Sequence, residues 1–161
     1  MRHDGQGVLP HAAGRNITGN QKRMLALLHE SHVIVDSTQR MDASQPVVPN
    51  AWLAECQPEA VIVDLSVDPY TLDTAPPVVK GIEGIPQGNL DQYVFEADDP
   101  CWDASVPANI PSRNRRKTVS CYSWPGIYPK RCMRVYGQQM LPLMRVLYHK
   151  TYDTLSADGP H

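Results

Sequence analysis

Two short apolar runs stand out in the pattern of hydrophobic and polar positions along this chain. The first runs from His32 to Asp36, with the sequence HVIVD, and the second from Ala60 to Asp68, with the sequence AVIVDLSVD. Both are rich in β-branched residues and too continuously apolar to alternate, which is typical of strands buried on both faces of a parallel α/β sheet. Because Pro69 cannot donate to a strand ladder, the second strand is predicted to end at about Asp68.

The spacing of the two runs predicts how their strands are connected. Their valines at 33 and 61 lie 28 residues apart, which suits a right-handed βαβ crossover of about 30 residues. The connecting stretch holds a turn-rich part, residues 39–49, and a short helical segment, residues 50–56. The strands are therefore predicted to be parallel neighbours, whose carboxyl ends place Ser37, Thr38 and Asp68 on one rim.

Other elements follow from the same pattern. A helix capped by Thr18 is predicted to run to about His29, with an apolar stripe of Met24, Leu27 and Leu28. Short strands are predicted within residues 77–84 and 118–124, with an exposed, proline-rich excursion over residues 96–112 between them.

The clearest helix in the pattern begins at Pro129. Its apolar residues recur at steps of three and four, and they are predicted to face the core: Cys132, Met133, Tyr136, Met140, Leu141, Met144, Leu147 and Tyr148. Pro142 interrupts the helix and is predicted to kink it or to remove one hydrogen bond.

Composition narrows the classes of protein to consider. The chain has 161 residues and a formal net charge of −2, which suits one domain with a real core and gives no general attraction to nucleic acid or anionic membranes. No apolar run approaches the roughly 20 residues of a membrane span, and the polar N-terminus lacks the apolar core of a signal peptide. We therefore expect a cytoplasmic protein with a disordered segment 1–15, a folded domain 16–152 and a disordered tail 153–161.

Few residue groups carry chemistry of their own. The four cysteines lack the spacing of a zinc site or a redox dithiol, and we expect reduced, mostly buried thiols and no metal. Four basic residues close together (Arg113, Arg115, Arg116 and Lys117) suggest an anion site or, as we favour, a solvated loop. Asp68 stands beyond a strand end, where open α/β sheets bind ligands; the alternative is an ordinary turn former.

The run from Ala60 to Asp68, followed by residues 79–89 (VKGIEGIPQGN), resembles the C-terminal half of the alanine dehydrogenase and pyridine nucleotide transhydrogenase family, with saccharopine dehydrogenases as relatives. In that family a strand of pattern V-D-x-x-x-D closes the NAD-binding domain, and a segment with a central proline follows, usually preceded by Asn-Met. This chain has Gly84, Ile85 and Pro86 there, without the asparagine. The resemblance covers about residues 30–148.

The resemblance implies a Rossmann-like parallel sheet with flanking helices that binds NAD(H), in an oxidoreductase acting on the CH–NH2 group of an amino acid or the corresponding 2-oxo acid. Asp68 matches the family's acid beside the nicotinamide and the substrate, which implies a catalytic role. A further set of residues would line the nicotinamide side of the cofactor site: Asp36, Ser37, Thr38, Ser66, Val67 and Ile85.

The family's glycine-rich pyrophosphate loop and its substrate domain have no counterpart in this sequence. The chain therefore reads as a Rossmann-like domain truncated at its N-terminus, and we expect it to bind NAD(H) alone weakly or not at all. It would function as a homo-oligomer or with a missing N-terminal half. The alternative is a non-catalytic interaction module that uses the open edge of a partial sheet to associate.

Overall fold

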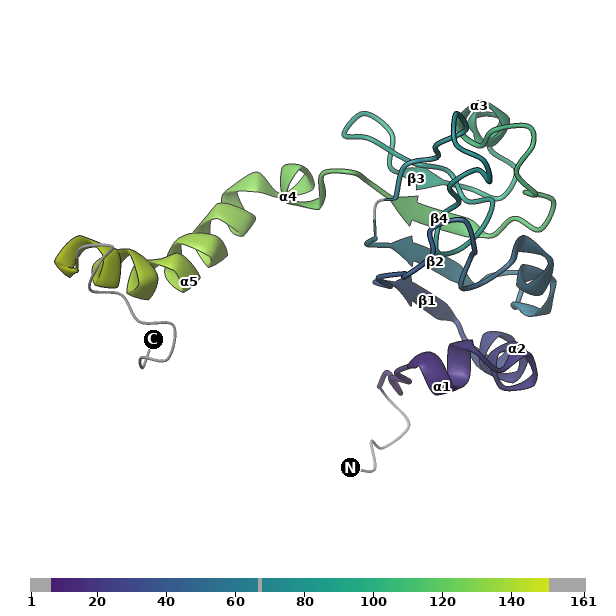
Figure 1. Cartoon of the computed structure of the whole chain (residues 1–161), viewed down its shortest axis with the longest axis horizontal. Coiled ribbons are helices and arrows are strands. Elements are labelled where there is room, and N and C mark those ends of the chain that lie inside the picture. Colours follow the sequence, from purple (N-terminus) through teal and green to yellow (C-terminus); the bar gives the residue numbers. More distant parts are fainter. Residues whose placement is uncertain (1–6, 67, 151–161) are drawn as a thin grey trace. The chain divides into compact units, whose positions relative to one another are not determined.

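A computed structural model describes residues 7–66 and 68–150, and the chain divides into two compact units, residues 1–122 and 123–161 (Figure 1). The first unit is α/β, as predicted. Its elements, in chain order, are α1 (Arg15–Thr18), α2 (Gln21–Glu30), β1 (Val33–Asp36), the 3-10 helix η1 (Asn50–Glu55), β2 (Val61–Asp64), β3 (Val94–Phe95), α3 (Cys101–Ser105) and β4 (Lys117–Ser120).

The strands form an open, mostly parallel sheet in the order β1-β2-β4-β3 (Figure 1). β1 pairs in parallel with β2, with Val33 opposite Val61, and β2 pairs in parallel with β4. β3 closes one side as an antiparallel strand. The predicted pairing of the first two strands is confirmed. A parallel pair needs a long crossover connection, and residues 37–60 provide it.

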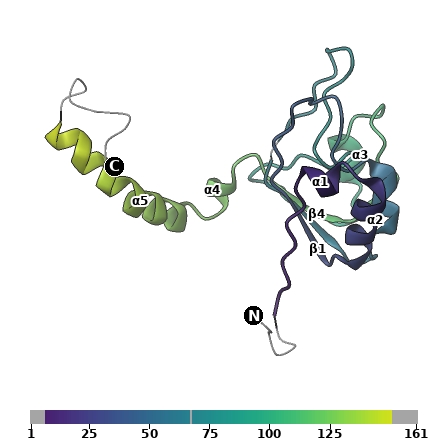
Figure 2. The same cartoon turned by 60° about the horizontal axis from the view of Figure 1, so that its bottom comes forward.

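The helices of the first unit pack on one face of this sheet. Ile34 and Ile62 lie opposite each other on that face and contact a core cluster that includes Met24 and Leu28 of α2 and Leu53 of η1. Figure 2 shows α1 and α2 lying beside the sheet. The helix α2 begins later than predicted, because Asn20 rather than Thr18 caps it: the Asn20 side chain accepts a hydrogen bond from the backbone N–H of Arg23 at 3.1 Å.

The prediction of an exposed excursion over residues 96–112 holds for most of the segment but misses the buried residues that attach it to the core. Phe95 of β3 and Trp102 of α3 are almost fully buried in a second core cluster, together with Val79, Val106 and Ile110. The indole N–H of Trp102 donates to the Gly84 carbonyl oxygen at 3.3 Å. The segment is rich in surface prolines and acidic residues, and the apolar residues that anchor it are widely spaced. The sequence pattern therefore did not reveal them.

The predicted strand over residues 77–84 is reduced to isolated bridges. Val78 pairs with Thr71, and Ile82 pairs with Val48. The segment is nonetheless buried, with Val79, Lys80 and Ile82 each exposing 6% or less of their surface. It therefore runs through the core as irregular chain rather than as part of the sheet.

Cys56, Cys101 and Cys132 are free thiols, and only two of the four cysteines are buried, where we expected most to be. Cys56 and Cys121 are buried, Cys132 is half-buried and Cys101 is exposed. Burial raises the pKa of the Cys56 thiol, so this thiol stays protonated and poorly nucleophilic.

The second unit consists of α4 (Trp124–Ile127) and α5 (Pro129–His149). The long helix begins at Pro129 and contains Pro142, as predicted. Its apolar stripe is not core, however: α5 has no buried residue, and Met140 and Leu147 expose 48% and 53% of their surface. No helix in the described part of the chain is long and apolar enough to cross a membrane.

Candidate functional site at the carboxyl ends of the parallel strands

The three parallel strands end at one edge of the sheet with polar residues. Asp36 closes β1 opposite Asp64 of β2, and Asp64 lies opposite Ser120 of β4. Their side chains are directed to the covered face, and each residue exposes 4% of its surface or less. This edge is where open α/β sheets bind ligands.

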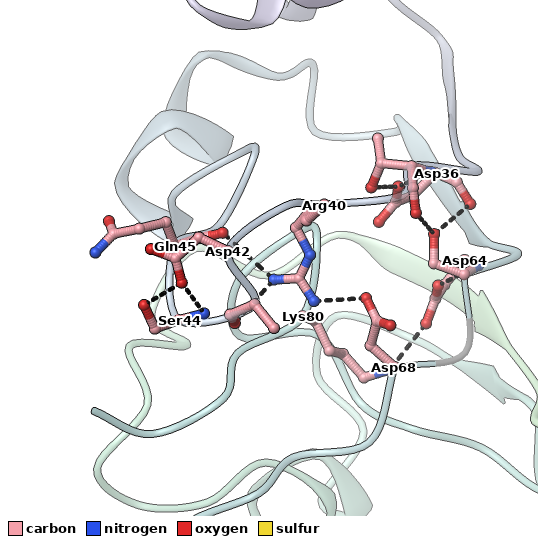
Figure 3. Close-up of polar contacts among 11 residues, drawn as sticks. Asp36, Arg40, Asp42, Ser44, Gln45, Asp64, Asp68 and Lys80 are labelled. Carbon is pink, nitrogen blue, oxygen red and sulfur yellow. Dashed lines mark hydrogen bonds and ion pairs between the residues drawn. The ribbon is translucent and has the colours of Figure 1, made fainter. Parts of the chain in front are cut away.

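A buried ion pair lies at the centre of this edge (Figure 3). The Lys80 ammonium lies 2.9 Å from Oδ2 of Asp64, and the hydroxyl of Ser120 donates to the same oxygen at 2.9 Å. Both charged side chains are almost fully buried. Sequence reasoning missed Lys80, although a lysine between Val79 and Gly81 in an apolar stretch signals a buried partner.

Tyr70 covers this pair from one side. Its ring centroid lies 5.7 Å from the Lys80 ammonium, and its hydroxyl donates to the Ile85 carbonyl oxygen at 2.7 Å. Burial, and then the charge of Asp64, raise the pKa of Tyr70 well above its usual value. Tyr70 therefore stays neutral, and the face of its ring attracts the Lys80 ammonium without neutralising its charge.

The prediction that β2 extends to Asp68 is wrong, because the strand ends at Asp64. The backbone N–H of Leu65 still donates to the Asp36 carbonyl at 2.8 Å, but that of Ser66 turns back to Oδ1 of Asp64 at 3.1 Å. An aspartate that accepts a hydrogen bond from two residues ahead forms a turn. The chain leaves the sheet there, and Asp68 lies in the loop beyond.

Asp68 remains at the same edge, held by an ion pair of its own (Figure 3). Its Oδ2 lies 2.6 Å from a guanidinium nitrogen of Arg40, and the Asp68 side chain is 32% exposed while that of Arg40 is 7% exposed. The Arg40 guanidinium also donates to the carbonyl oxygen of Ala43 at 3.2 Å. The carboxylate is thus oriented yet accessible.

Asp36 has one satisfied and one unsatisfied oxygen. Oδ1 accepts hydrogen bonds from the backbone N–H and the hydroxyl of Thr38, at 3.0 and 2.7 Å. Oδ2 is buried and has no hydrogen-bond donor among the described residues. A Cβ at Gly81 would overlap this oxygen, so the glycine makes room for the carboxylate. A buried carboxylate oxygen without a donor among the described residues is rare, which sets Asp36 apart from the other carboxylates at this edge.

The other predicted cofactor residues lie in different surroundings. Ser37 is exposed, and the Ser66 hydroxyl donates to the Thr38 carbonyl at 3.2 Å, so the two strand-end loops are joined. Ile85 exposes no surface and packs in the first core cluster, where a ligand reaches it only after its neighbours move. Val67 lies outside the described residues.

A hollow of about 320 Å³ adjoins this edge. Thr38, Arg40 and Arg15 help to line it, and its volume is at the lower end for small-molecule sites. A larger hollow of about 560 Å³ lies over Gly19, Asn20 and Leu25 at the start of α2 and includes none of the strand-end residues. The smaller one is next to the strand-end residues through Thr38 and Arg40, although Asp36, Ser66 and Asp68 do not line it.

Three of the four residues of the basic cluster contact other parts of the chain, and the fourth, Arg113, is exposed. Arg116 donates to the carbonyl oxygens of Cys56 and Gln57 at 2.7 and 2.8 Å, and Lys117 pairs with Glu96 at 2.5 Å. Arg115 pairs with Asp103 and lies over the Trp102 ring. These residues tie the segment before β4 to its neighbours, instead of forming the solvated loop that the sequence favoured. In the described residues, no group of three or more His, Cys, Asp or Glu side chains is arranged to hold a metal.

Comparisons with known proteins agree with the fold. No model of a known protein family and no curated protein matches the sequence. A solved structure described as L-alanine dehydrogenase is similar to 82% of this chain, with a TM-score of 0.52 and 15% sequence identity. The similar region is 30% of that chain, so this chain spans less than a third of its length. At this identity the likeness shows the fold alone, and the resemblance predicted from the sequence is confirmed as a distant structural relationship.

Proposed function

We propose that this chain provides the nicotinamide side of an NAD(H) site in an amino-acid dehydrogenase, with Asp68 beside the substrate. The observation that carries the proposal is that two carboxylates lie at the carboxyl edge of the parallel strands: Asp36 has a buried oxygen without a donor among the described residues, and Asp68 is oriented and accessible. The similarity to part of an L-alanine dehydrogenase supports it at the level of the fold. The activity of such an enzyme, its amino acid or 2-oxo acid substrate and its cofactor are all part of the proposal.

The residues present suit the hydroxyl groups of a nucleotide. The unsatisfied Oδ2 of Asp36 calls for a donor, and a ribose hydroxyl is one that a carboxylate can accept. The Thr38 side chain donates to Asp36, and the Ser66 hydroxyl donates to the Thr38 carbonyl oxygen, so both hydroxyl groups lie where the loops after β1 and β2 meet. Because Oδ2 is buried, a small shift at the Gly81 side has to accompany binding.

Asp68 is the group that suits proton transfer at the substrate. When bound, NAD(H) supplies or receives the hydride. The Asp68 carboxylate is kept in place by Arg40 and is reachable from solvent, so it can orient the amino group of a substrate or take a proton from a water beside it. Asp64 differs, because Lys80 and Ser120 occupy its Oδ2 inside the core; we assign it a structural role.

Ligand fragments test this proposal in the chain as it stands. We expect nicotinamide mononucleotide and NADH to bind with dissociation constants of about 1 mM, since half a site gives only about 4 kcal/mol. ADP, which carries the pyrophosphate and adenosine without the nicotinamide, should bind at least about tenfold more weakly, because the chain lacks a glycine-rich loop for it.

Equilibrium dialysis at millimolar ligand, or calorimetry, measures these affinities. Equal binding of ADP and nicotinamide mononucleotide would place the pyrophosphate rather than the nicotinamide on this chain. Micromolar binding of NADH would show that a complete site is present and that the assignment of half a site is wrong.

A further inference from the structure

The cation that holds the Asp68 carboxylate comes from a different loop (Figure 3). Arg40 follows β1 and Asp68 follows β2, and the two residues are 28 positions apart in the chain. Nη2 of Arg40 lies 2.6 Å from Oδ2 of Asp68, and the Arg40 side chain is only 7% exposed. Burial limits the rotamers of a long side chain that moves freely on an open surface. The pair therefore joins a confined cation to an accessible carboxylate.

A second set of contacts fixes the direction of the Arg40 guanidinium. Its Nη1 donates to the carbonyl oxygens of Ala43 and Gln45, at 3.2 and 3.4 Å. A guanidinium is planar, and its donors point in fixed directions. Because two carbonyl oxygens hold Nη1, the backbone of the loop after β1 directs Nη2 at Asp68.

This loop is tied in turn to a buried part of the chain. The carbonyl oxygen of Ala43 also accepts a hydrogen bond from the backbone N–H of Val79 at 2.9 Å, and the carbonyl oxygen of Gly81 accepts one from Val47 at 2.8 Å. Val79 is itself buried. A continuous series of hydrogen bonds thus leads from buried backbone, through the Arg40 guanidinium, to the carboxylate at the edge of the sheet.

The Asp68 side chain has little else to orient it. Among the described residues, no other hydrogen bond or ion pair engages this side chain, and its Oδ1 has no donor. A side chain of this kind can rotate about its Cα–Cβ bond between staggered rotamers. The orientation of the accessible carboxylate therefore depends on Arg40.

We propose that Arg40 is the positioning residue of Asp68: it fixes Oδ2 and leaves Oδ1 as the oxygen that meets the substrate. The inference rests on the proposed function, because it needs Asp68 beside the substrate. Arg40 acts only through Asp68 and does not itself touch the reacting groups. Such placement matters for turnover, since a misplacement of about 1 Å can lower a rate by about a hundredfold.

The rotamer populations of Asp68 test this role in the chain as it stands. Three-bond NMR couplings across the Cα–Cβ bond report these populations. We expect one dominant rotamer in the wild-type chain and averaged couplings in Arg40→Gln, which removes both the charge and the fork of donors. Arg40→Lys keeps a cation without the planar fork, so it should restore the single rotamer only in part. An unchanged single rotamer in Arg40→Gln, or averaged couplings in the wild-type chain, overturns the proposal.

The matched control is Arg115→Gln, which removes another arginine–aspartate pair, the one with Asp103. It should leave the Asp68 couplings unchanged. The amide resonance of Ile62, inside the sheet, checks that each variant is folded. If Arg40→Gln fails this check, Arg40→Lys decides the question: partly averaged couplings support the proposal, and wild-type couplings overturn it.

A double-variant cycle separates positioning from a merely structural tie between the loops. In an assembly that turns over substrate, Arg40→Gln should lower kcat by about tenfold or more. When Asp68→Asn is already present, the same change should lower kcat by less than about twofold, because Arg40 acts only through Asp68. Equal losses in both backgrounds would mean that Arg40 supports the fold in general, and would overturn the positioning role.

Failure of this inference can be distinguished from failure of the proposed function. Normal turnover in Asp68→Asn contradicts the proposed function, even where the couplings show that Arg40 orients Asp68. Impaired turnover in Asp68→Asn together with normal turnover in Arg40→Gln leaves the proposed function standing and overturns the positioning role.

Discussion

Two ion pairs at the same edge of the sheet differ in how far water reaches them. Lys80 and Asp64 are buried in the core beside Tyr70, and Asp64 also accepts a hydrogen bond from the Ser120 hydroxyl. Arg40 and Asp68 lie in the loops beyond the strands, and the Asp68 side chain is 32% exposed. A carboxylate that is both sealed and fully paired serves the fold, while one that is oriented and accessible can meet a substrate. Position at a strand end therefore does not by itself define a catalytic acid: Asp64 closes a strand but is buried and paired, whereas Asp68 is accessible.

The largest expected effect is the loss of stability when the sealed pair is broken. Asp64→Asn or Lys80→Met should each lower the free energy of unfolding by about 3–5 kcal/mol, because either change leaves one charge buried without its partner. The double variant Lys80→Met with Asp64→Asn should lose less than the sum, since no uncompensated charge remains. Urea denaturation followed by circular dichroism measures all three.

The control for this experiment is Lys117→Met, which breaks the exposed pair with Glu96. Exposed ion pairs contribute about 1 kcal/mol or less, so this variant should unfold close to the wild-type midpoint. An equal loss of unfolding free energy in Lys117→Met and Lys80→Met would mean that burial does not determine how much an ion pair contributes to stability.

The accessible pair should show the opposite behaviour. Asp68→Asn keeps the shape of the side chain and an oxygen that can accept from Arg40, which also donates to the Ala43 carbonyl oxygen, so we expect its unfolding free energy to fall by less than that of Asp64→Asn. In an assembly that turns over substrate, its turnover number should fall by about two decades or more, a common contribution of a positioned acid–base group. Steady-state kinetics with the matched control Asp91→Asn, which alters an exposed turn, measures this. Near-normal turnover would reduce Asp68 to a turn former.

A smaller effect is expected at Asp36, the carboxylate that closes β1. Asp36→Asn keeps the acceptor for Thr38 and removes the charge at the unsatisfied Oδ2. Because a hydrogen bond to a charged group contributes about 1.5–3 kcal/mol, affinity for nicotinamide mononucleotide should fall by about tenfold or more. Calorimetric titration against Asp91→Asn tests it. Unchanged affinity would mean that Oδ2 receives no ligand.

Much of the sheet could be predicted from the sequence, since it depends on local pattern. The runs at residues 33–36 and 61–64 form the adjacent parallel strands that their β-branched pattern indicated. The end of β2 was misplaced because Pro69 is a strong strand stop, while the earlier turn depends on a hydrogen bond that the backbone N–H of Ser66 donates to the Asp64 side chain. That bond competes with the strand ladder and leaves no periodic signal.

The site was only partly predictable, because its parts come from distant segments. Asp36, Thr38 and Asp68 could be placed at the strand ends, but Lys80 and Arg40 reach this edge through irregular chain. The stripe on α5 was assigned to the core because helical periodicity marks an apolar face without saying what covers it. The structure leaves that stripe exposed.

Amide chemical-shift mapping with nicotinamide mononucleotide tests the central claim most directly. In a titration of the isotopically labelled chain to about 10 mM, well above the millimolar affinity expected of half a site, the largest shifts should occur at Asp36, Thr38, Ser66 and Asp68. The Lys80–Asp64 pair should shift little, because it stays sealed. Shifts centred on the hollow at Gly19–Leu25, or no shifts at this concentration, would contradict a nicotinamide site at the strand ends.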